Sequence, residues 1–203
     1  MIHPVAADVA ARRRAVEIVR AGGLVVIPTD TVYGIAVDAT VAGSTDALFA
    51  AKGRPRAVPV AVLVAEEADA WAIAADPVPD AARLLARQWW PGALTLIVRR
   101  NPSWTADLGD DGGTVGLRCP DHEWVRALCR ETGPLATTSA NRHGGLTPPD
   151  ASGVAALLGD CDSVELIVDG GRLDGSASTV VDCTGASPRL VREGRLPETD
   201  LWS

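Results

Sequence analysis

Hydrophobic and polar positions follow two different periods along the chain. In several segments the apolar residues fall on one helical face, which predicts helices over residues 8–21, 44–51, 66–75, 80–90, 121–131 and 151–158. Between them lie short aliphatic runs that suit buried strands, at residues 24–28, 60–64, 93–98, 114–118, 135–138, 164–168, 179–181 and 190–191. Because the two kinds of segment interleave throughout, the sequence predicts an α/β fold.

Residues with capping preferences mark several helix ends. Gly22 and Gly23 close the first predicted helix, because glycine tolerates the left-handed backbone of a C-cap. Ser44 or Thr45 is expected to cap the second helix, and Asp121 the fifth. Short polar side chains of this kind accept hydrogen bonds from the free N–H groups of the first helical turn.

The composition fits one domain, which we expect to span residues 1–203. The chain is 47% hydrophobic and 22% charged, and a single core can serve a chain of this length. No apolar run approaches the roughly 18 residues that cross a bilayer, and the basic triplet at 12–14 is not followed by the apolar stretch of a secretory signal. The sequence therefore predicts a cytoplasmic protein that does not associate with membranes.

The charge balance argues against a nucleic-acid-binding protein. The chain has 19 basic and 26 acidic residues, a net charge of −7, whereas affinity for phosphate backbones comes mostly from excess lysine and arginine. We expect no stable nucleic-acid binding, although arginines could still gather on one face. Lys52 is the only lysine, which singles it out among the basic residues.

The cysteines and a group of aspartates do not suit a metal site. No CxxC pair and no histidine at ligand spacing accompanies Cys119, Cys129, Cys161 and Cys183. A free cysteine in apolar surroundings packs as a small core residue, so we expect neither disulfides nor a protein-bound metal. Spacing also argues against metal binding by Asp107, Asp110 and Asp111.

Clusters of polar side chains are the candidate binding segments. In α/β sheets, ligands bind at the ends of strands, and four clusters match this placement, at residues 28–34, 52–55, 137–141 and 176–179. None of them fits a Walker A loop, GxGxxG, GxSxG or HExxH, which removes the ordinary P-loop, Rossmann, hydrolase and zincin interpretations.

Each candidate residue has two interpretations. Lys52 and Arg54 flank one glycine and can direct two cations at a phosphate chain, although spacing alone fits a solvated helix end somewhat better. Ser139 and Asn141 can face one side of a strand end, or they can cap their own turn. Arg118 ends a short strand and can clamp a carboxylate, or it is a surface charge.

Seven short fragments together resemble the YrdC-type threonylcarbamoyl-AMP synthase family. They are PTDTVYG at 28–34, KGRP at 52–55, WPGALTLIV at 90–98, TVGLRCP at 114–120, SAN at 139–141, STVVD at 178–182 and VREG at 191–194. Each is weak alone, but their order over nearly the whole chain makes the resemblance specific. It implies a twisted mixed sheet with flanking helices around a concave active site.

The resemblance also implies a reaction. A nucleotidyltransferase of this family converts L-threonine, bicarbonate and ATP into threonylcarbamoyl-AMP and pyrophosphate, for threonylcarbamoyladenosine modification of tRNA by a downstream tRNA threonylcarbamoyl transferase. Because a carbamate is a weak and unstable nucleophile, most of the catalysis would be positioning and charge neutralisation. Mg²⁺ is expected with ATP, because the triphosphate charge needs neutralising.

The resemblance also implies which residues form the site, because individual positions of this chain match the family's site residues. Lys52, Arg54, Ser139 and Asn141 match the family's set at the triphosphate and reacting centre, and are the expected catalytic and ATP-binding residues. 

Further positions match the two halves of the pocket. Thr31 matches a threonine at the amino-acid substrate, and Arg118 an arginine expected on its carboxylate. Polar lining positions are matched by Thr114 on the ATP side and by Thr137 and Ser178 on the threonine side, and an arginine near the nucleotide is matched by Arg192.

The sequence departs from the family pattern in three places. Thr137-Thr138 follow Ala136 where an Ala-Pro pair is usual, and Glu193 replaces a frequent proline. Few residues follow Arg192, which predicts the short form without the second domain that long members append. Two alternatives remain open: an RNA-binding module of the same fold, and a carbamoyltransferase domain that uses carbamoyl-AMP.

Overall fold

A single mixed sheet runs through the residues that the computed structural model describes, which are 2–110, 112–158, 161 and 163–202. Its strands are β1 (Val5–Ala6), β2 (Leu24–Ile27), β3 (Gly34–Val37), β4 (Ala61–Leu63), β5 (Leu94–Arg99), β6 (Thr114–Arg118), β7 (Leu135–Ser139), β8 (Val164–Asp169), β9 (Thr179–Asp182) and β10 (Arg189–Arg192). The helices are α1 (Val9–Arg20), α2 (Ser44–Lys52), α3 (Glu67–Ile73), α4 (Asp80–Trp89), α5 (Glu123–Thr132), α6 (Ala151–Leu158) and α7 (Glu198–Leu201). Asp111 lies outside the described residues.

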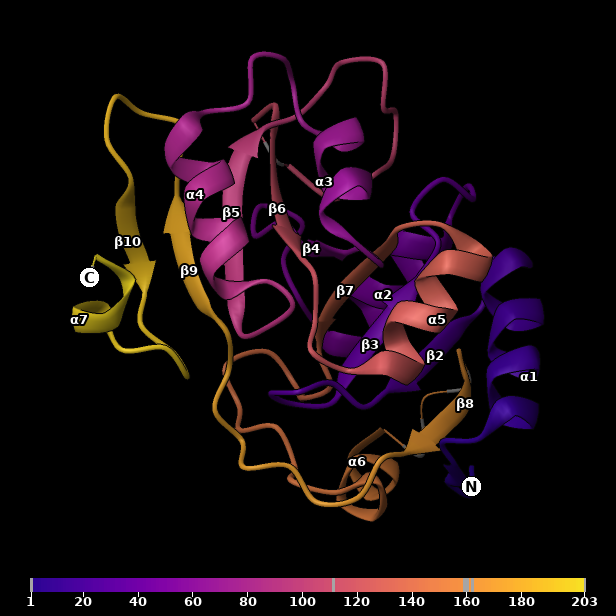
Figure 1. The fold of residues 1–203 in the computed structure, drawn as a ribbon. Coiled ribbons are helices and arrows are strands. Elements are labelled where there is room, and N and C mark those ends of the chain that lie inside the picture. The colour runs from indigo at the N-terminus through magenta and orange to yellow at the C-terminus, as the bar shows by residue number, and fades with distance from the viewer. Residues whose placement is uncertain (1, 111, 159–160, 162, 203) are drawn as a thin grey trace.

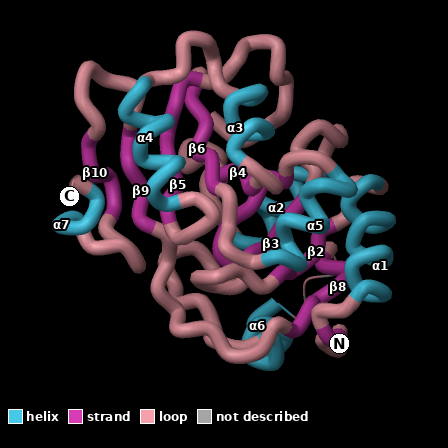
Figure 2. Tube along the Cα trace, viewed as in Figure 1, coloured by secondary structure: helices cyan, strands magenta, loops and turns pink. Residues whose placement is uncertain are grey.

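The strand order brings distant parts of the chain together. Within the described ranges it is β1-β8-β2-β3-β7-β4-β6-β5-β9-β10. The pairs β1–β8, β2–β8, β4–β6 and β5–β9 are parallel, and the other neighbouring pairs are antiparallel. A loop connection crosses the molecule from β8 near one edge to β9 near the other (Figure 2). The predicted α/β fold with a mixed sheet is confirmed.

The two faces of the sheet are covered differently. On one face, α1 and α5 lie side by side (Figure 1) and pack on Val25, Ile27 and Leu135 among others. On the other face, α2, α3, α4 and α6 share a larger core that includes Leu94 and Leu96. Among the described residues, the core beneath α1 and α5 contains no residue of β5 or β6, so these helices leave that part of their face free.

Most predicted elements are present, with a few differences. The chain also forms β1, β3 and α7, which the hydrophobic pattern did not indicate. Gly34–Val37 of β3 is buried along its whole length between β2 and β7, but it is short and directly follows a threonine-rich loop. None of the described helices is long and apolar enough to span a membrane.

Two predicted helix caps are wrong. Helix α2 begins after Gly43, whose φ of 81° is left-handed, and no side chain caps it. Ser44 instead donates from its hydroxyl to the carbonyl oxygens of Asp38 and Val41. Helix α5 begins after His122 rather than Asp121, again with no side-chain cap.

Candidate active site

A cavity of about 450 Å³ lies on the sheet face that carries α1 and α5, over the strands beyond those helices. Its floor comes mainly from alternate strand residues, namely Ala61 and Leu63 of β4, Thr95 and Ile97 of β5, and Thr114, Gly116 and Arg118 of β6. The residues between them, such as Leu94, Leu96 and Leu117, pack into the core on the opposite face. The pleat of the strands therefore separates the cavity from the core.

The structure brings the predicted site residues together at this cavity. Its lining includes Thr31, Arg54, Thr114, Arg118, Thr137, Ser139, Ser178 and Arg192. The remaining two, Lys52 and Asn141, are buried behind Ser139 and bonded to it. Their placement agrees with a shared site, while the role of each residue stays a prediction.

Lys52 connects the end of α2 to the end of β7. Its ammonium Nζ donates to the Ser139 carbonyl oxygen at 2.5 Å, to Ser139 Oγ at 2.9 Å and to Asn141 Oδ1 at 2.5 Å. Ser139 Oγ in turn donates to Asn141 Oδ1 at 2.6 Å, and the Asn141 amide donates to the Gly145 carbonyl. An ammonium has three N–H donors, so this network uses all of them.

The environment of Lys52 also changes its acidity. Lys52 is 2% exposed, and this burial, with a smaller contribution from the charge of Arg54, lowers the pKa of Lys52 to about 8. A buried ammonium near a second cation is a favourable place for an anion. The burial of Lys52 does not fit a solvated helix end, while its role at a phosphate stays a prediction.

Arginines supply further positive charge around the cavity. Burial, and then the charge of Arg192, lower the pKa of Arg54. Arg54 donates from Nε to the Val58 carbonyl at 2.7 Å and from Nη2 to the Pro59 carbonyl at 2.8 Å, and Arg192 donates to the Ser178 carbonyl at 2.7 Å. Each of these guanidiniums retains N–H groups beyond these bonds, so together they can hold a polyanion.

Arg118 is a buried cation held by three hydrogen bonds. It is 6% exposed and donates from Nε to the Gly92 carbonyl at 3.0 Å, from Nη1 to Thr31 Oγ1 at 2.9 Å and from Nη2 to Asp30 Oδ1 at 2.6 Å. A guanidinium has five N–H groups, so among the described residues one hydrogen stays free on each terminal nitrogen. A guanidinium with one N–H group left on each terminal nitrogen can still donate to a carboxylate.

A pair of threonines holds the loop beside Arg118. Thr29 Oγ1 accepts from the backbone N–H groups of Thr31 and Val32 and donates to the Val32 carbonyl at 2.7 Å. The Thr29 and Thr31 hydroxyls lie 3.0 Å apart, and Thr31 Oγ1 accepts from Arg118 Nη1. Thr31 is fully buried and orients Arg118 from one side.

The other predicted lining residues form the walls of the cavity. Ser178 Oγ lies 2.9 Å from Thr95 Oγ1. Thr137 donates to the Leu135 carbonyl at 3.2 Å. Thr114 lies opposite Arg99 in the pairing of β6 with β5. These side chains give the cavity a hydroxyl-rich wall next to the aliphatic side chains of residues such as Ile97 and Val180.

Sequence reasoning missed Asp30, Thr29, Thr95 and Arg195. Asp30 stands inside the 28–34 fragment, where its charge between two threonines was a signal. Arg195 donates from Nη1 to the Asp30 carbonyl oxygen at 2.6 Å and pairs with Asp174 at 3.0 Å. Nothing local in the sequence joins residues so far apart.

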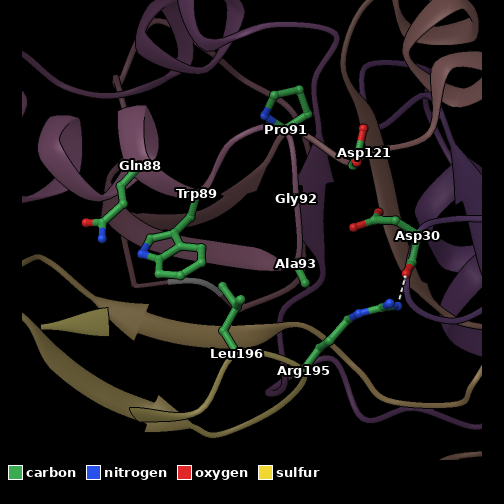
Figure 3. A pocket seen from close by; sticks show the side chains of 9 residues that line it. All are labelled: Asp30, Gln88, Trp89, Pro91, Gly92, Ala93, Asp121, Arg195 and Leu196. Atoms are coloured by element: carbon green, nitrogen blue, oxygen red, sulfur yellow. Dashed lines mark hydrogen bonds between the residues drawn. The ribbon is translucent and has the colours of Figure 1, made fainter. Parts of the chain in front are cut away.

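A smaller cavity of about 260 Å³ is lined by Asp30, whose neighbours Thr29 and Thr31 line the first cavity. Figure 3 shows Asp30, Asp121 and Arg195 at its wall, with Arg195 bonded to the backbone of Asp30. Gly92, whose carbonyl accepts from Arg118, also lines it. The contacts around Arg118 thus separate the two cavities.

The fold and the main cavity define an α/β protein with a concave, cation-lined site. The family model Sua5_yciO_yrdC, described as "Telomere recombination", matches residues 17–194. The chain belongs to this Sua5/YciO/YrdC family, as the resemblance predicted.

Individual relatives agree with this assignment. A Mycobacterium tuberculosis protein named "Putative threonylcarbamoyl-AMP synthase" is 48% identical over 184 residues, which cover 89% of this chain and 82% of that protein. The Bacillus subtilis threonylcarbamoyl-AMP synthase is 36% identical over 192 residues, 93% of this chain and 54% of that protein. The crystal structure of Pyrococcus abyssi Sua5 complexed with L-threonine matches with a TM-score of 0.86 and 34% identity, over 94% of this chain and 56% of that one. This chain thus spans about half the length of the last two proteins.

Proposed function

We propose that this chain is a threonylcarbamoyl-AMP synthase, a nucleotidyltransferase that uses L-threonine, bicarbonate and ATP. The observation that carries the proposal is the pair of free N–H groups on Arg118 in the same cavity as Arg54 and Arg192. One cavity can therefore receive a carboxylate at one end and a polyphosphate at the other. The names of the relatives support the same activity.

The residues divide between the two substrates. Arg118, oriented by Thr31, would bind the carboxylate of threonine, with Thr137 and Ser178 as nearby hydroxyls. Arg54, Arg192 and Thr114 would face ATP. Lys52 would place its charge behind Ser139 and Asn141, and a phosphate oxygen could replace one of its three present acceptors.

The chemistry needs positioning more than a protein nucleophile. The threonine amine and bicarbonate combine to a carbamate and release water. A carbamate oxygen then attacks the α-phosphorus, so the P–O bond to the β-phosphate breaks and pyrophosphate leaves. Cations placed before the reaction stabilise charge on the transferring phosphorus and the leaving group, which is the work that the arginines and Lys52 would do.

Mg²⁺ enters this proposal as part of the ATP substrate. Among the described residues, no group of three His, Cys, Asp or Glu side chains could hold a metal ion. The predicted ATP side offers hydroxyl, amide and cationic groups, which suit the phosphates rather than the metal. Mg²⁺ binds readily to substrate phosphates and retained waters, so a metal carried by the nucleotide fits the donor set.

We also propose a cytoplasmic location and a downstream tRNA threonylcarbamoyl transferase as the consumer of the product. The cysteines among the described residues are free thiols, as in a reducing compartment. The comparisons favour neither an RNA-binding module nor a carbamoyltransferase domain. Stable nucleic-acid binding is not expected from the net charge of −7.

Pyrophosphate release tests the proposal directly. Purified protein with ATP, Mg²⁺, bicarbonate and L-threonine should release pyrophosphate, and omission of any one component should stop it. Release that continues without threonine would refute the proposed substrate. Tight binding of tRNA at physiological salt, without turnover, would favour the RNA-binding alternative.

A further inference from the structure

We propose that Asp30 is a positioning residue that holds the guanidinium of Arg118 in the orientation needed for the carboxylate of the amino-acid substrate. The inference rests on the proposed function and names a residue that acts through Arg118. Asp30 would not touch the reacting atoms. Its effect would therefore appear in the requirement for threonine rather than in that for ATP.

The contacts of Arg118 are the first support. The guanidinium is planar, and its three nitrogens are bound by three different segments, the Gly92 carbonyl, the Thr31 hydroxyl and the Asp30 carboxylate. The bond to Asp30, at 2.6 Å, is the only one of the three in which the acceptor is charged as well as the donor. Such bonds are shorter and stronger than neutral ones, so Asp30 contributes most to fixing the rotation of the group.

Burial strengthens this pair. The side chains of Arg118 and Asp30 are 7% and 15% exposed, so solvent screens their attraction much less than at the surface. Removing one partner of a buried pair leaves an uncompensated charge. Without Asp30, Arg118 would turn toward other acceptors or water, and its two remaining N–H groups would lose their fixed orientation.

Asp30 is itself held in place. The Thr29 hydroxyl organises the backbone on its C-terminal side, and Arg195 donates to the Asp30 carbonyl at 2.6 Å. Figure 3 shows this contact from the second cavity, with the Asp30 side chain turned away from Arg195. The carboxylate is therefore presented to Arg118 by a fixed backbone.

Asp30 and the substrate carboxylate would bind different N–H groups of Arg118. If Asp30 instead competed with the substrate for Arg118, its removal would improve threonine binding, which is the opposite outcome.

The test compares Asp30→Asn and Asp30→Glu with the wild-type chain. Asp30→Asn keeps an oxygen acceptor but removes the charge, and should raise the threonine concentration for half-maximal rate about tenfold, the cost of one charge-assisted bond. The ATP requirement should stay within about twofold, below what loss of a single hydrogen bond to ATP would cause. Asp30→Glu restores the charge and should recover most of the threonine affinity. Asp46→Asn, which removes an exposed ion pair with Arg56 and contacts neither Asp30 nor Arg118, is the matched control and should change neither requirement.

Calorimetric titration of L-threonine into each protein gives a second reading without turnover. The Asp30→Asn variant should bind threonine about tenfold more weakly, with unchanged circular dichroism. Unchanged or tighter threonine binding by the folded variant would overturn the positioning role. A wild-type protein that binds threonine but releases no threonine-dependent pyrophosphate would refute the proposed function alone. A wild-type protein that does not bind threonine would overturn both.

Discussion

The ammonium of Lys52 lies 2.9 Å from the hydroxyl of Ser139, although 87 residues separate them in the sequence. The bond joins the C-terminus of α2 to the end of β7, and Asn141 completes it. Lys52 is therefore part of the wall that would present Ser139 to the nucleotide. Its removal would affect both the charge of the site and the position of that wall.

Lys52→Ala should lower the rate of pyrophosphate formation at least about tenfold, because charge-assisted bonds of about 1.5–3 kcal/mol each are lost. Burial of the freed Asn141 and Ser139 acceptors will also lower the melting temperature by a few degrees, roughly 2–4 °C per kcal/mol for this size. Steady-state assays and thermal melts measure the two effects. Arg87→Ala, at an exposed position on α4, is the control. A variant with normal activity would exclude Lys52 from the site.

The rate should depend on the protonation of Lys52. Burial, then the charge of Arg54, lower the pKa of Lys52 to about 8, and a neutral amine can donate only two hydrogen bonds. The value of kcat/KM for ATP should therefore fall as the pH rises through about 8. Bound triphosphate favours the charged form, so the decline in kcat should begin at higher pH. A pH–rate profile measures both.

The lowered pKa of Lys52 also makes the free energy of unfolding depend on pH. Because the folded pKa lies below the usual value of 10.5, the buried charge destabilises the fold fully below pH 8. The free energy of unfolding should therefore rise as the pH increases from about 8 toward 10.5. Lys52→Arg keeps the charge at all these pH values. If that variant retains activity and also retains the alkaline decline, the titrating group is not Lys52.

Arg118→Lys should raise the threonine concentration for half-maximal rate by about tenfold or more, with little change for ATP. Lysine keeps the charge but cannot contact Gly92, Thr31 and a substrate at once with planar geometry. Initial rates at varied threonine and varied ATP provide the comparison, with Arg130→Lys on the surface of α5 as the control. An equal shift in the two requirements would place Arg118 at the nucleotide instead.

Arg54→Ala should raise the ATP requirement or lower turnover by at least about tenfold, because one charge-assisted contact to phosphate is lost. Its present bonds to the Val58 and Pro59 carbonyls lie in a half-exposed loop, so folding should survive. ATP titrations of activity measure the effect. The control is Arg172→Ala, since its side chain is 77% exposed. Equal losses in melting temperature and activity would indicate a structural role for Arg54.

A metal chelator should stop pyrophosphate release by removing Mg²⁺ from ATP, while the melting temperature of the protein alone stays the same. The reason is that the described residues contain no group of His, Cys, Asp or Glu side chains that could hold a metal ion. Thermal melts with and without chelator, beside activity assays with Mg²⁺ restored, give the result. A large fall in melting temperature would reveal a structural metal.

The hydrophobic pattern predicted most of the elements, because it is recorded in local sequence, whereas the candidate site residues came from the family resemblance. Alternating residues on β5 and β6 mark one polar and one apolar face, and the polar clusters follow strand ends. The strand Gly34–Val37 was missed because four buried residues carry little periodicity.

The partners of Arg118 could not be predicted from local sequence patterns. Thr31 and Asp30 lie 87 and 88 residues away from it in the sequence, and only the pairing order of the sheet brings them together. The same holds for Asp30 itself, whose charge looks like that of any loop aspartate until Arg118 is placed beside it. The contribution of single residues to substrate binding is therefore less predictable than the fold.

The pairing of β5 with β9 has a consequence for synthesis of the protein. The cavity floor comes from residues 61–118, but Ser178, Val180 and Arg192 on its far wall arrive with the last strands. A ribosome-bound chain must therefore extend through residue 192, plus the length of the exit tunnel, before the wall can close over the floor. The complete cavity would therefore form late, after most of the sheet is already available to pair.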